Sequence, residues 1–415
     1  MKTLEKLRDK LNKNAELSGQ EKETNKIINK FLEKTNPDVH YKNVGGYGII
    51  AIYKGVEEGK NILFRADIDG LNIPLGQQTT DNRQQSVSKT NGQQFTVPEL
   101  VEGKDQRFDK LSDRKVQSSE FKVQSQYSHR CGHDGHATIL CGLAMRYGKK
   151  RPEKGNVILL FQPAEETGEG ALAVINDPLF KEIKIDMAFA LHNLPGFAKH
   201  QIILKKGCFA SASLGLKLIF EGATSHASQP EKGNNPQRVI TTLLDAFQKK
   251  YEKLKRDKYY TTLTVTHVAI GEETFGVTPG HAEIWLTLRS QDDKSLQNLT
   301  DSTIALSEYV AKEFKLKFSH SIHEAFAATM NSSRETELVE QAAKDLKLSV
   351  NNIKEPFPWS EDFGRFGTLC PVCLFGLGSG LEHEPLHSPI YDFEDEIIDT
   401  GVEVFYQLGV EGMRI

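Results

Sequence analysis

The sequence has few features of an exported, membrane-bound or disulfide-stabilised protein. Its 415 residues include five cysteines, an odd and scattered number that does not suit a disulfide framework. No stretch approaches the roughly 18 consecutive apolar residues that a membrane helix needs. The first 35 residues are rich in lysine and glutamate and lack the apolar segment of a signal peptide. We therefore expect a cytoplasmic protein with free thiols and no membrane partner.

The chain also lacks an excess of charge of one sign. Its 52 basic and 56 acidic residues are well mixed along the chain and give a net charge of -4. The sequence has no basic stripe of the kind that binds nucleic acid, so we expect no nucleic acid partner. Hydrophobic residues at 38% and charged residues at 26% are typical of a globular protein. The chain is longer than a single core usually supports, so we expect two domains.

Apolar runs along the first half of the chain predict a sheet covered by helices. The opening segment repeats leucine and isoleucine at helical spacing up to Phe31. Tyr47–Tyr53 and Asn61–Ala66 are predicted strands, separated by a turn at Glu58–Lys60. Short apolar runs of buried strands alternate with helical segments further on: strands Asn156–Phe161 and Asp186–Leu191, helices Gly135–Tyr147 and Glu169–Ile175. This alternation predicts the α/β class, with catalytic groups at the ends of the strands.

A second pattern begins near Ser213 and ends near Ile322. Its order is strand, helix, strand, strand, helix, strand, which predicts an inserted α+β domain of the ferredoxin-like type. We predict a catalytic domain built from residues 1–209 and 324–415, with the insertion at 210–323. Residues 77–126 are polar and without a clear period, and we interpret them as a surface insertion that either shapes a site entrance or is simply tolerated.

Groups that bind first-row metals follow several predicted strands. Cys131 and His133 lie in the run Cys-Gly-His-Asp-Gly-His, and carboxylates follow the strand that ends near Phe161. Thiolate, imidazole and carboxylate ligands converging from strand ends suit a hydrolytic metal centre, in which a neighbouring carboxylate can accept a proton. The candidates are Asp67, Asp69, Cys131, His133, Glu165, Glu166, His192 and His387.

Each candidate alone also has a purely structural explanation. Cys131 alone is more often a small buried residue, His192 a hydrogen-bonded histidine at a strand end, and Glu165 with Glu166 an acidic pair at a helix start. Their weight comes from occurring together. The run His383–His387 matches HExxH, but a proline inside it excludes the helical spacing that zinc proteases need, so we keep only His387.

The ordered motifs resemble the amidohydrolase branch of the metal-dependent aminoacylase and glutamate-carboxypeptidase family, which includes hippurate hydrolases, N-acetyl-diaminopimelate deacetylases and indoleacetyl-amino-acid hydrolases. The resemblance runs almost from end to end and implies a zinc-exopeptidase-like mixed sheet flanked by helices, with an inserted α+β domain that acts as a lid and in dimerisation. The motifs that carry it are Phe64–Asp69, His129–His136, Phe161–Glu166, Leu191–Asn193, His226–Ser228, Ser360–Phe363 and Leu386–Pro389.

The resemblance implies a site with two divalent metal ions, zinc or manganese, with cobalt or nickel as alternatives. The implied ligands are Cys131, His133, Glu166, His192 and His387. Glu165 matches the general base that takes a proton from the attacking water and protonates the leaving amine. Asp69 matches a carboxylate that orients a ligand, and His226 matches a histidine that stabilises the oxyanion. His226 would serve its own subunit or a neighbour's, because the inserted domain closes over the site and often forms a homodimer in this family.

Two positions depart from the family's pattern. Gly276 stands where an asparagine often helps to hold the substrate carboxylate, although Arg289 matches the arginine of the same domain. The polar segment 77–126 replaces a much shorter link.

Three functions are compatible with the sequence. The first is a dinuclear-metal amidohydrolase that acts on N-acyl amino acids or similar small amides, which Cys131 favours over the peptidase branches. The second is a dipeptidase or carboxypeptidase of the same fold, with a dipeptide-like substrate. The third is a non-catalytic binding protein on this scaffold, against which the intact Glu165 and metal ligands argue.

Overall fold

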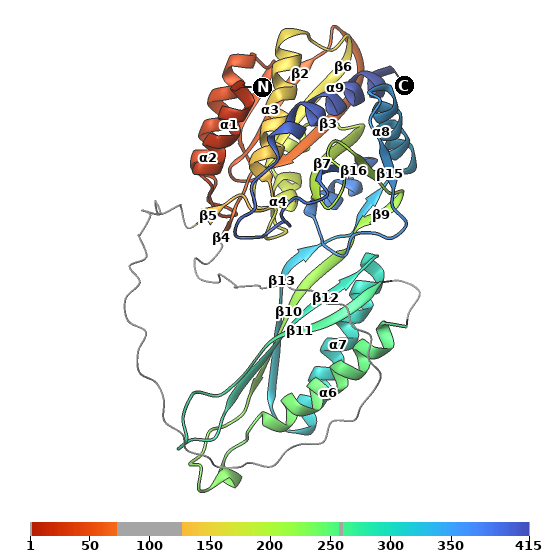
Figure 1. Cartoon of the computed structure of the whole chain (residues 1–415). Helices are drawn as coiled ribbons and strands as arrows, with labels where there is room; N and C mark the ends of the chain where they lie inside the picture. Colours follow the sequence, from red (N-terminus) through yellow and green to blue (C-terminus); the bar gives the residue numbers. More distant parts are fainter. Residues whose placement is uncertain (1, 73–126, 257–259, 415) are drawn as a thin grey trace, which may run out of the picture.

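The computed structural model describes residues 2–72, 127–256 and 260–414. The whole of the predicted polar insertion, residues 77–126, lies outside the described residues. An eight-stranded sheet and a four-stranded sheet dominate the fold, and the smaller sheet extends away from the larger one (Figure 1). Both chain ends lie in the part that contains the large sheet. In the described part of the chain, no helix is long and apolar enough to cross a membrane.

The large sheet is mixed, as the resemblance implies. Its strands, in spatial order, are β1 (Val39–Val44), β2 (Gly48–Lys54), β6 (Lys154–Gln162), β3 (Glu57–Asp67), β7 (Met187–Pro195), β16 (Val372–Gly380), β8 (Ile202–Leu204) and β15 (Val350–Asn352). Strands β6, β3, β7 and β16 run parallel to one another. The carboxyl ends of these four central strands therefore meet at one edge of the sheet.

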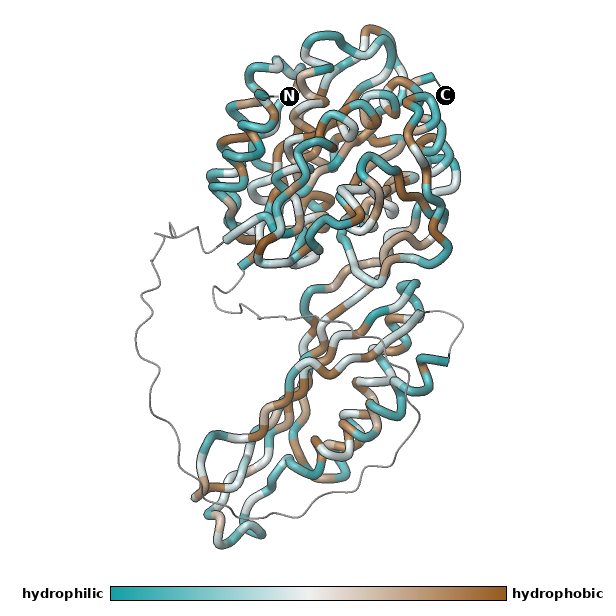
Figure 2. The backbone as a smooth tube through the Cα atoms, in the orientation of Figure 1, coloured by the Kyte–Doolittle hydropathy of each residue, from teal (hydrophilic) through white to brown (hydrophobic). Residues whose placement is uncertain are grey.

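Helices cover both faces of the large sheet. One face packs against α1 (Lys2–Lys13), α2 (Lys22–Leu32), α3 (His133–Lys149), α8 (Ser333–Asp345) and α9 (Ile398–Arg414). The other face packs against α4 (Gly170–Asn176), α5 (Pro178–Lys181) and the 3-10 helix η3 (Asp362–Thr368). Because both faces are buried, the central strands are nearly continuous apolar runs, which Figure 2 shows as hydrophobic segments inside a hydrophilic outer layer.

The small sheet is antiparallel, and within the described residues its helices lie on one face only. Its order is β11 (Thr261–Ile270), β12 (His281–Ser290), β10 (Ala212–Glu221) and β13 (Lys317–Phe326). Alternate residues such as Leu216, Leu218 and Phe220 face α6 (Gln237–Leu254) and α7 (Asp293–Glu313), and the residues between them face away. This is the strand and helix order that the sequence predicts for the insertion. The domain boundaries at 209/210 and 323/324 stay a prediction.

Short elements connect the two sheets and the site. Strand β9 (Gly207–Ala210) pairs with β14 (Thr329–Asn331) just outside the small sheet, and β4 (Leu71–Asn72) pairs with β5 (Tyr127–Ser128) near the site. The remaining short helices are η1 (Glu33–Thr35), η2 (Pro230–Lys232) and η4 (Asp395–Ile397).

Two local predictions are wrong. The opening helical segment is two helices, because the chain turns at Gly19 with a φ of 75° and folds back toward the sheet between Asn14 and Glu21. The expected turn at Glu58–Lys60 lies inside β3 instead. A Cβ on Gly59 would be 2.7 Å from the Gly155 backbone nitrogen, so glycine here permits close approach of two backbones rather than a turn.

Candidate metal centre and active site

The predicted site residues lie where the central parallel strands end. Asp67 is the last residue of β3, Glu165 and Glu166 follow β6, and His192 lies toward the end of β7. Since these strands are parallel neighbours, their carboxyl ends place the three segments side by side. The sheet therefore collects residues that are more than a hundred positions apart in the sequence.

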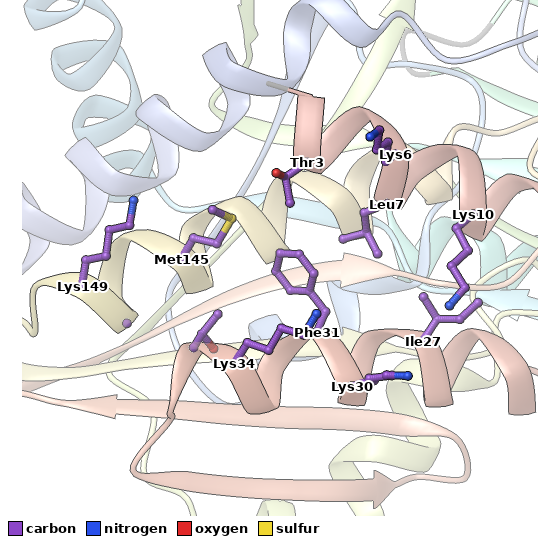
Figure 3. Close-up of a pocket in the computed structure, with 12 residues that line it drawn as sticks. Thr3, Lys6, Leu7, Lys10, Ile27, Lys30, Phe31, Lys34, Met145 and Lys149 are labelled. Atoms are coloured by element: carbon purple, nitrogen blue, oxygen red, sulfur yellow. The ribbon is translucent and has the colours of Figure 1, made fainter.

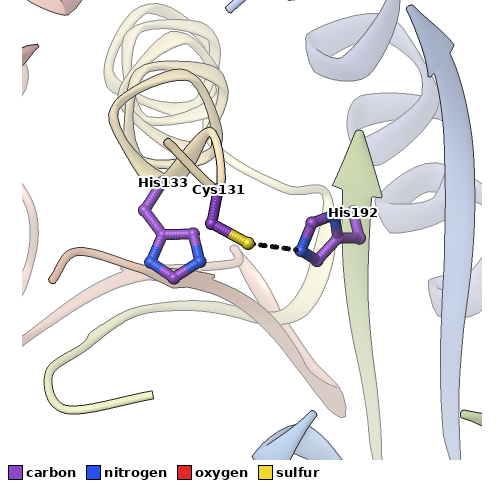
Figure 4. Close-up of side chains that lie close together, drawn as sticks. All are labelled: Cys131, His133 and His192. Atoms are coloured by element: carbon purple, nitrogen blue, oxygen red, sulfur yellow. Dashed lines mark hydrogen bonds between the residues drawn. The ribbon is translucent and has the colours of Figure 1, made fainter. Parts of the chain in front are cut away.

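Cys131 and His133 reach the same place from the start of α3. Gly132 has a φ of 94°, and this left-handed residue turns the chain from the loop into the helix. The turn orients Cys131 toward β7, so its Sγ lies 3.5 Å from His192 Nε2 (Figure 4). His133 is the first residue of α3 and lies beside Cys131 in Figure 4, and all three side chains are buried.

Two groups of possible metal ligands share Cys131. The first contains Cys131, His133 and His192, and the second contains Cys131, Glu166 and His387. In each group the ligand atoms all lie within 4.8 Å of one another. The structure thus brings together the five residues that the resemblance implies as ligands. Thiolate, imidazole and carboxylate are a donor set that suits zinc and related divalent ions.

Unpartnered polar atoms support a metal between these side chains. His133 Nε2 and Glu166 Oε1 are buried, lie 3.7 Å apart and have no hydrogen-bond partner among the described residues. His387 Nε2 approaches Glu166 Oε1 from the solvent side at 3.9 Å. Buried polar atoms in folded proteins are nearly always paired, so lone pairs left facing one another fit divalent cations.

The electrostatics of the cluster point the same way. Burial raises the pKa of Glu165 well above its ordinary value, and the nearby carboxylates of Glu361 and Glu166 add to the increase. Burial likewise raises the pKa of Glu166 to about 7 and that of the Cys131 thiol well above its usual range. For His192, burial lowers the pKa to about 3, so its ring offers a neutral nitrogen. Anionic groups crowded in a buried place are stabilised when a cation joins them.

Asp69 connects three parts of the site. Its Oδ1 lies 3.2 Å from His133 Nδ1, and its Oδ2 accepts a hydrogen bond from the Glu166 backbone N–H at 3.0 Å. Ser18, in the segment between α1 and α2, donates to the same Oδ2 at 2.7 Å. These contacts orient the His133 ring so that Nε2 faces Glu166.

Glu21 is a site-supporting residue that the sequence patterns do not reveal. Its side chain is fully buried, and Oε1 accepts hydrogen bonds from the backbone N–H groups of Gly19 at 2.7 Å and of Ala164 at 2.9 Å. Ala164 has a φ of 51°, a conformation that L residues rarely adopt, and it directly precedes Glu165. Glu21 therefore stabilises the strained backbone position that presents Glu165 and Glu166.

Arg65 organises a buried network beneath the cluster. Its guanidinium contacts the carboxylates of Asp67 at 2.7 Å and Asp362 at 2.8 Å, and it also pairs with Glu361. Arg65 Nε donates to Gln162 at 2.9 Å. The motif Ser360–Phe363 has a role here that its spacing does not reveal, because its two acids share one buried cation with the end of β3.

His136 is the third imidazole of the cysteine motif. Its Nδ1 lies 2.7 Å from Asp67 Oδ1 and its Nε2 lies 2.7 Å from Asn193 Oδ1, so both ring nitrogens are occupied by protein groups. The ring packs edge-on against His192 at 4.7 Å between centroids. His136 thus packs behind the proposed ligand His192 and is held by Asp67 and Asn193. In the sequence, it is marked by its place in the repeated Gly-His pattern of the cysteine motif.

His226 lies far from this cluster in the same chain. Strand β10 starts beside the part of the chain that forms the large sheet, where the Ser211 backbone N–H donates a hydrogen bond to the Phe357 carbonyl. The ten residues of β10, at about 3.3 Å each, then carry the chain about 30 Å away. His226 follows the far end of this strand. It is exposed on the loop, where its Nδ1 lies 2.7 Å from Ser228 Oγ. The structure therefore does not bring His226 into its own subunit's metal cluster.

Arg289 lies at the near end of the small sheet. Its Nη1 donates to the Pro358 carbonyl and to Ser360 Oγ, each at 3.1 Å. Ser360 immediately precedes Glu361 of the Arg65 network, and Trp359 packs on His192 with centroids 5.4 Å apart. Arg289 is therefore close to the site, although its guanidinium here contacts protein groups. Gly276 is far from it, on the exposed loop that bridges to His226.

Comparison with known proteins identifies the family. Residues 108–410 match Peptidase family M20/M25/M40, and the chain belongs to this family. It is 25% identical over 412 residues to the hippurate hydrolase of Campylobacter jejuni, covering 99% of this chain and 96% of that protein. It is 28% identical over 412 residues to an N-acetyl-L-cysteine deacetylase of Bacillus subtilis, covering 98% and 88%.

Solved structures share the fold. The YxeP protein of Bacillus subtilis, described as a dinuclear metal binding peptidase of the M20 family, matches with a TM-score of 0.74 and 22% identity over 100% of this chain and 98% of that chain. A tripeptidase from Staphylococcus aureus matches with a TM-score of 0.67 and 13% identity, covering 99% and 98%. The expected fold and family are thus confirmed, and the protein is a metal-dependent hydrolase.

Proposed function

We propose that this protein is a dinuclear-metal amidohydrolase that cleaves the amide bond of N-acyl amino acids. The observation that carries the proposal is the position of Cys131 in two ligand groups at once, with the carboxyl group of Glu165 beside them. His133 and His192 would complete the set for one ion, and Glu166 and His387 the set for the other. Bound divalent ions would polarise the amide carbonyl and make the attacking water more acidic.

Glu165 is the proposed proton carrier. Its Oε2 lies 3.8 Å from His133 Nε2, which places the carboxylate at the border of the ligand cluster. A carboxyl whose pKa is raised by burial and by neighbouring acids can take a proton from water and return it to the leaving amine. The Arg65 network holds Glu361 and Asp362 in place behind it, while Asp69 and Glu21 fix the backbone around it.

The names of the relatives support the proposed substrate class. Both curated relatives described above are named for the removal of an acyl group from an amino acid, and each aligns over nearly the whole chain. We propose Arg289 as the group that binds the substrate carboxylate, once it exchanges its contacts with Pro358 and Ser360 for the ligand. The cytoplasmic location and the choice between zinc and manganese stay predictions.

We also propose that His226 acts in the site of a second subunit. The strand length that separates it from its own metal cluster supports this proposal, and so does β11, a strand at the edge of the small sheet with exposed Val265 and Val268. His226 would then donate a hydrogen bond to the oxyanion that forms when water adds to the amide carbonyl.

A substrate panel and one variant test the main proposal. The protein is stripped of metal and reconstituted with zinc or manganese, and its hydrolysis of hippurate, N-acetylcysteine and dipeptides is then measured. We expect N-acyl amino acids to be hydrolysed fastest, and Glu165→Gln to lose about a thousandfold or more in kcat while it retains its metals. Preferential turnover of dipeptides would favour the peptidase alternative. Unchanged turnover in Glu165→Gln would refute the mechanism.

Mixed subunits test the role of His226. Inactive Glu165→Gln chains and inactive His226→Ala chains are unfolded, combined in equal amounts and refolded. If His226 serves the partner, each mixed dimer has one complete site, and random pairing restores about a quarter of wild-type activity. If His226 serves its own subunit, no mixed dimer has a complete site and activity does not return.

A further inference from the structure

A groove in the helical layer that covers one face of the large sheet has features of a binding site. It lies between α1, α2 with η1, and the end of α3, and its volume is about 440 Å³. Leu7 and Ile27 at its base are buried, while Phe31 and Met145 are half-buried. Figure 3 shows Leu7 and Phe31 pointing toward one another across the space between the two helices. The base of the groove is therefore apolar and recessed.

The rim of this groove carries positive charge only. Its charged lining residues are Lys6, Lys10, Lys30, Lys34 and Lys149. None of them has a described carboxylate within ion-pair distance. Nearby acids form their ion pairs with other cations: Asp9 with Arg8, Glu23 with Lys26, and Glu33 with Lys42. Glu33 is also close enough to Lys30 for this lysine to help lower the pKa of the carboxyl. A chain with a net charge of -4 thus gathers five cations around one apolar surface.

The spacing of these lysines makes their ammonium groups repel one another when the groove holds no anion. Lys6 and Lys10 are four residues apart on α1, and Lys30 and Lys34 are four residues apart on α2 and η1. Like charges at this spacing repel one another on a helix surface. Lys10 from α1 and Lys34 from η1 both reach toward the space between the two helices, and Lys149 lies at the end of the groove (Figure 3). An anion between them would relieve the repulsion.

We propose that this groove binds a small amphiphilic anion, an aliphatic or aromatic group that ends in a carboxylate. The apolar base accommodates the hydrocarbon part, and the lysine rim pairs with the carboxylate. A volume of about 440 Å³ is within the range of small-molecule sites. A flat membrane surface fits less well, because the apolar side chains lie below the lysine heads and not above them.

Binding of dodecanoate tests this proposal. Dodecanoate is titrated into the metal-loaded, full-length protein below its micelle concentration, and binding is measured by isothermal titration calorimetry. Dodecyltrimethylammonium, which has the same alkyl chain and the opposite charge, is titrated as the comparison. We expect dodecanoate to bind and the cationic probe to bind at least about tenfold more weakly. Raising the salt concentration should weaken dodecanoate binding, since the lysines are exposed. Equal binding of the two probes would overturn the proposal.

Charge-reversal variants locate the binding. Lys6→Glu combined with Lys30→Glu should weaken dodecanoate binding about tenfold or more, because it reverses one charge on each side of the groove. Lys13→Glu combined with Lys22→Glu is the matched control, since these exposed lysines lie on the same helices outside the groove. A milder pair, Lys34→Gln with Lys149→Gln, gives a second measurement. Equal binding by groove and control variants, or binding only to phosphatidylglycerol vesicles or to a poly-glutamate peptide, would contradict the proposal.

Discussion

Glu21 provides the sharpest test of how the fold prepares the catalytic carboxylates. In Glu21→Ala the backbone N–H groups of Ala164 and Gly19 lose their acceptor. Glu21→Gln keeps an oxygen that can accept both hydrogen bonds. The two variants therefore separate the contact from the charge. Glu23→Ala is a suitable control, because Glu23 is exposed in the first turn of α2, directly after Glu21, and its side chain pairs with the exposed Lys26.

The expected effect on catalysis follows from the strained residue. A left-handed Ala164 costs about 1 to 3 kcal/mol and persists only while its surroundings hold it. An unsatisfied buried donor adds about 1 to 3 kcal/mol. Without Glu21 the loop should relax, and displacing a catalytic group by about 1 Å can reduce the rate about 100-fold. We expect kcat for hippurate to fall roughly 10- to 100-fold in Glu21→Ala and less than about threefold in Glu21→Gln.

The same residue predicts a dependence of stability on pH. Burial raises the pKa of Glu21 from 4.5 to about 7, so the folded state holds a proton that the unfolded state releases. Stability from this group is fully present below pH 4.5 and is lost as the pH rises through 7. Glu21→Gln does not titrate. Its stability relative to wild type should therefore increase by about 2 kcal/mol between pH 5 and pH 8, measured by urea unfolding of metal-stripped protein.

Two results would refute this account of Glu21. Equal losses of kcat in the alanine and glutamine variants would show that the carboxylate charge, and not the accepted hydrogen bonds, matters. A flat difference in stability between pH 5 and pH 8 would show that Glu21 is already ionised in the folded protein.

Three further changes test other parts of the site. Gly132→Ala should destabilise the protein by about 2 kcal/mol or more, because φ is positive and the new Cβ would lie 2.5 Å from Asn193 Oδ1. Gly196→Ala is the control, since φ is also positive there but no atom lies within 4 Å of the new Cβ, so urea unfolding should show only the backbone cost of about 1 kcal/mol. Arg65→Met should cost about 3 to 5 kcal/mol, since three buried carboxylates lose their cation, and a loss below about 1 kcal/mol would contradict this. Cys131→Ala should reduce bound zinc by about one ion per chain or more, whereas Cys141→Ala, a buried thiol outside both ligand groups, should retain all of it by elemental analysis.

Much of the fold can be predicted from local patterns. Strands β6 and β7 are short apolar runs, and α6 and α7 have long amphipathic patterns, so their positions follow from periodicity. The break between α1 and α2 could not be predicted in this way, because helical spacing continues on both sides of it. It depends on tertiary contacts of the segment 14–21, which returns to pair Leu17 with Gly70.

The site could be predicted in part for a similar reason. Ligand types with short spacing, such as Cys131 and His133, are visible in one motif. Glu21 could not be found, because a single glutamate in a lysine- and glutamate-rich segment has no distinguishing pattern. Its role depends on the buried N–H of Ala164, which lies 143 residues away. The distance of His226 from its own site depends on the direction of β10, which hydrophobic spacing does not define.

The small sheet leaves and rejoins the rest of the chain through paired neighbours. Ser213 at the start of β10 lies opposite Phe326 at the end of β13, and just outside them Ala210 lies opposite Thr329. About 115 residues therefore begin and end at adjoining points. A short linker across these points would close the chain without disturbing a strand of the large sheet. In evolutionary terms, such a segment can be gained, exchanged or lost as a unit, while the rest of the chain, with the metal cluster, keeps its architecture.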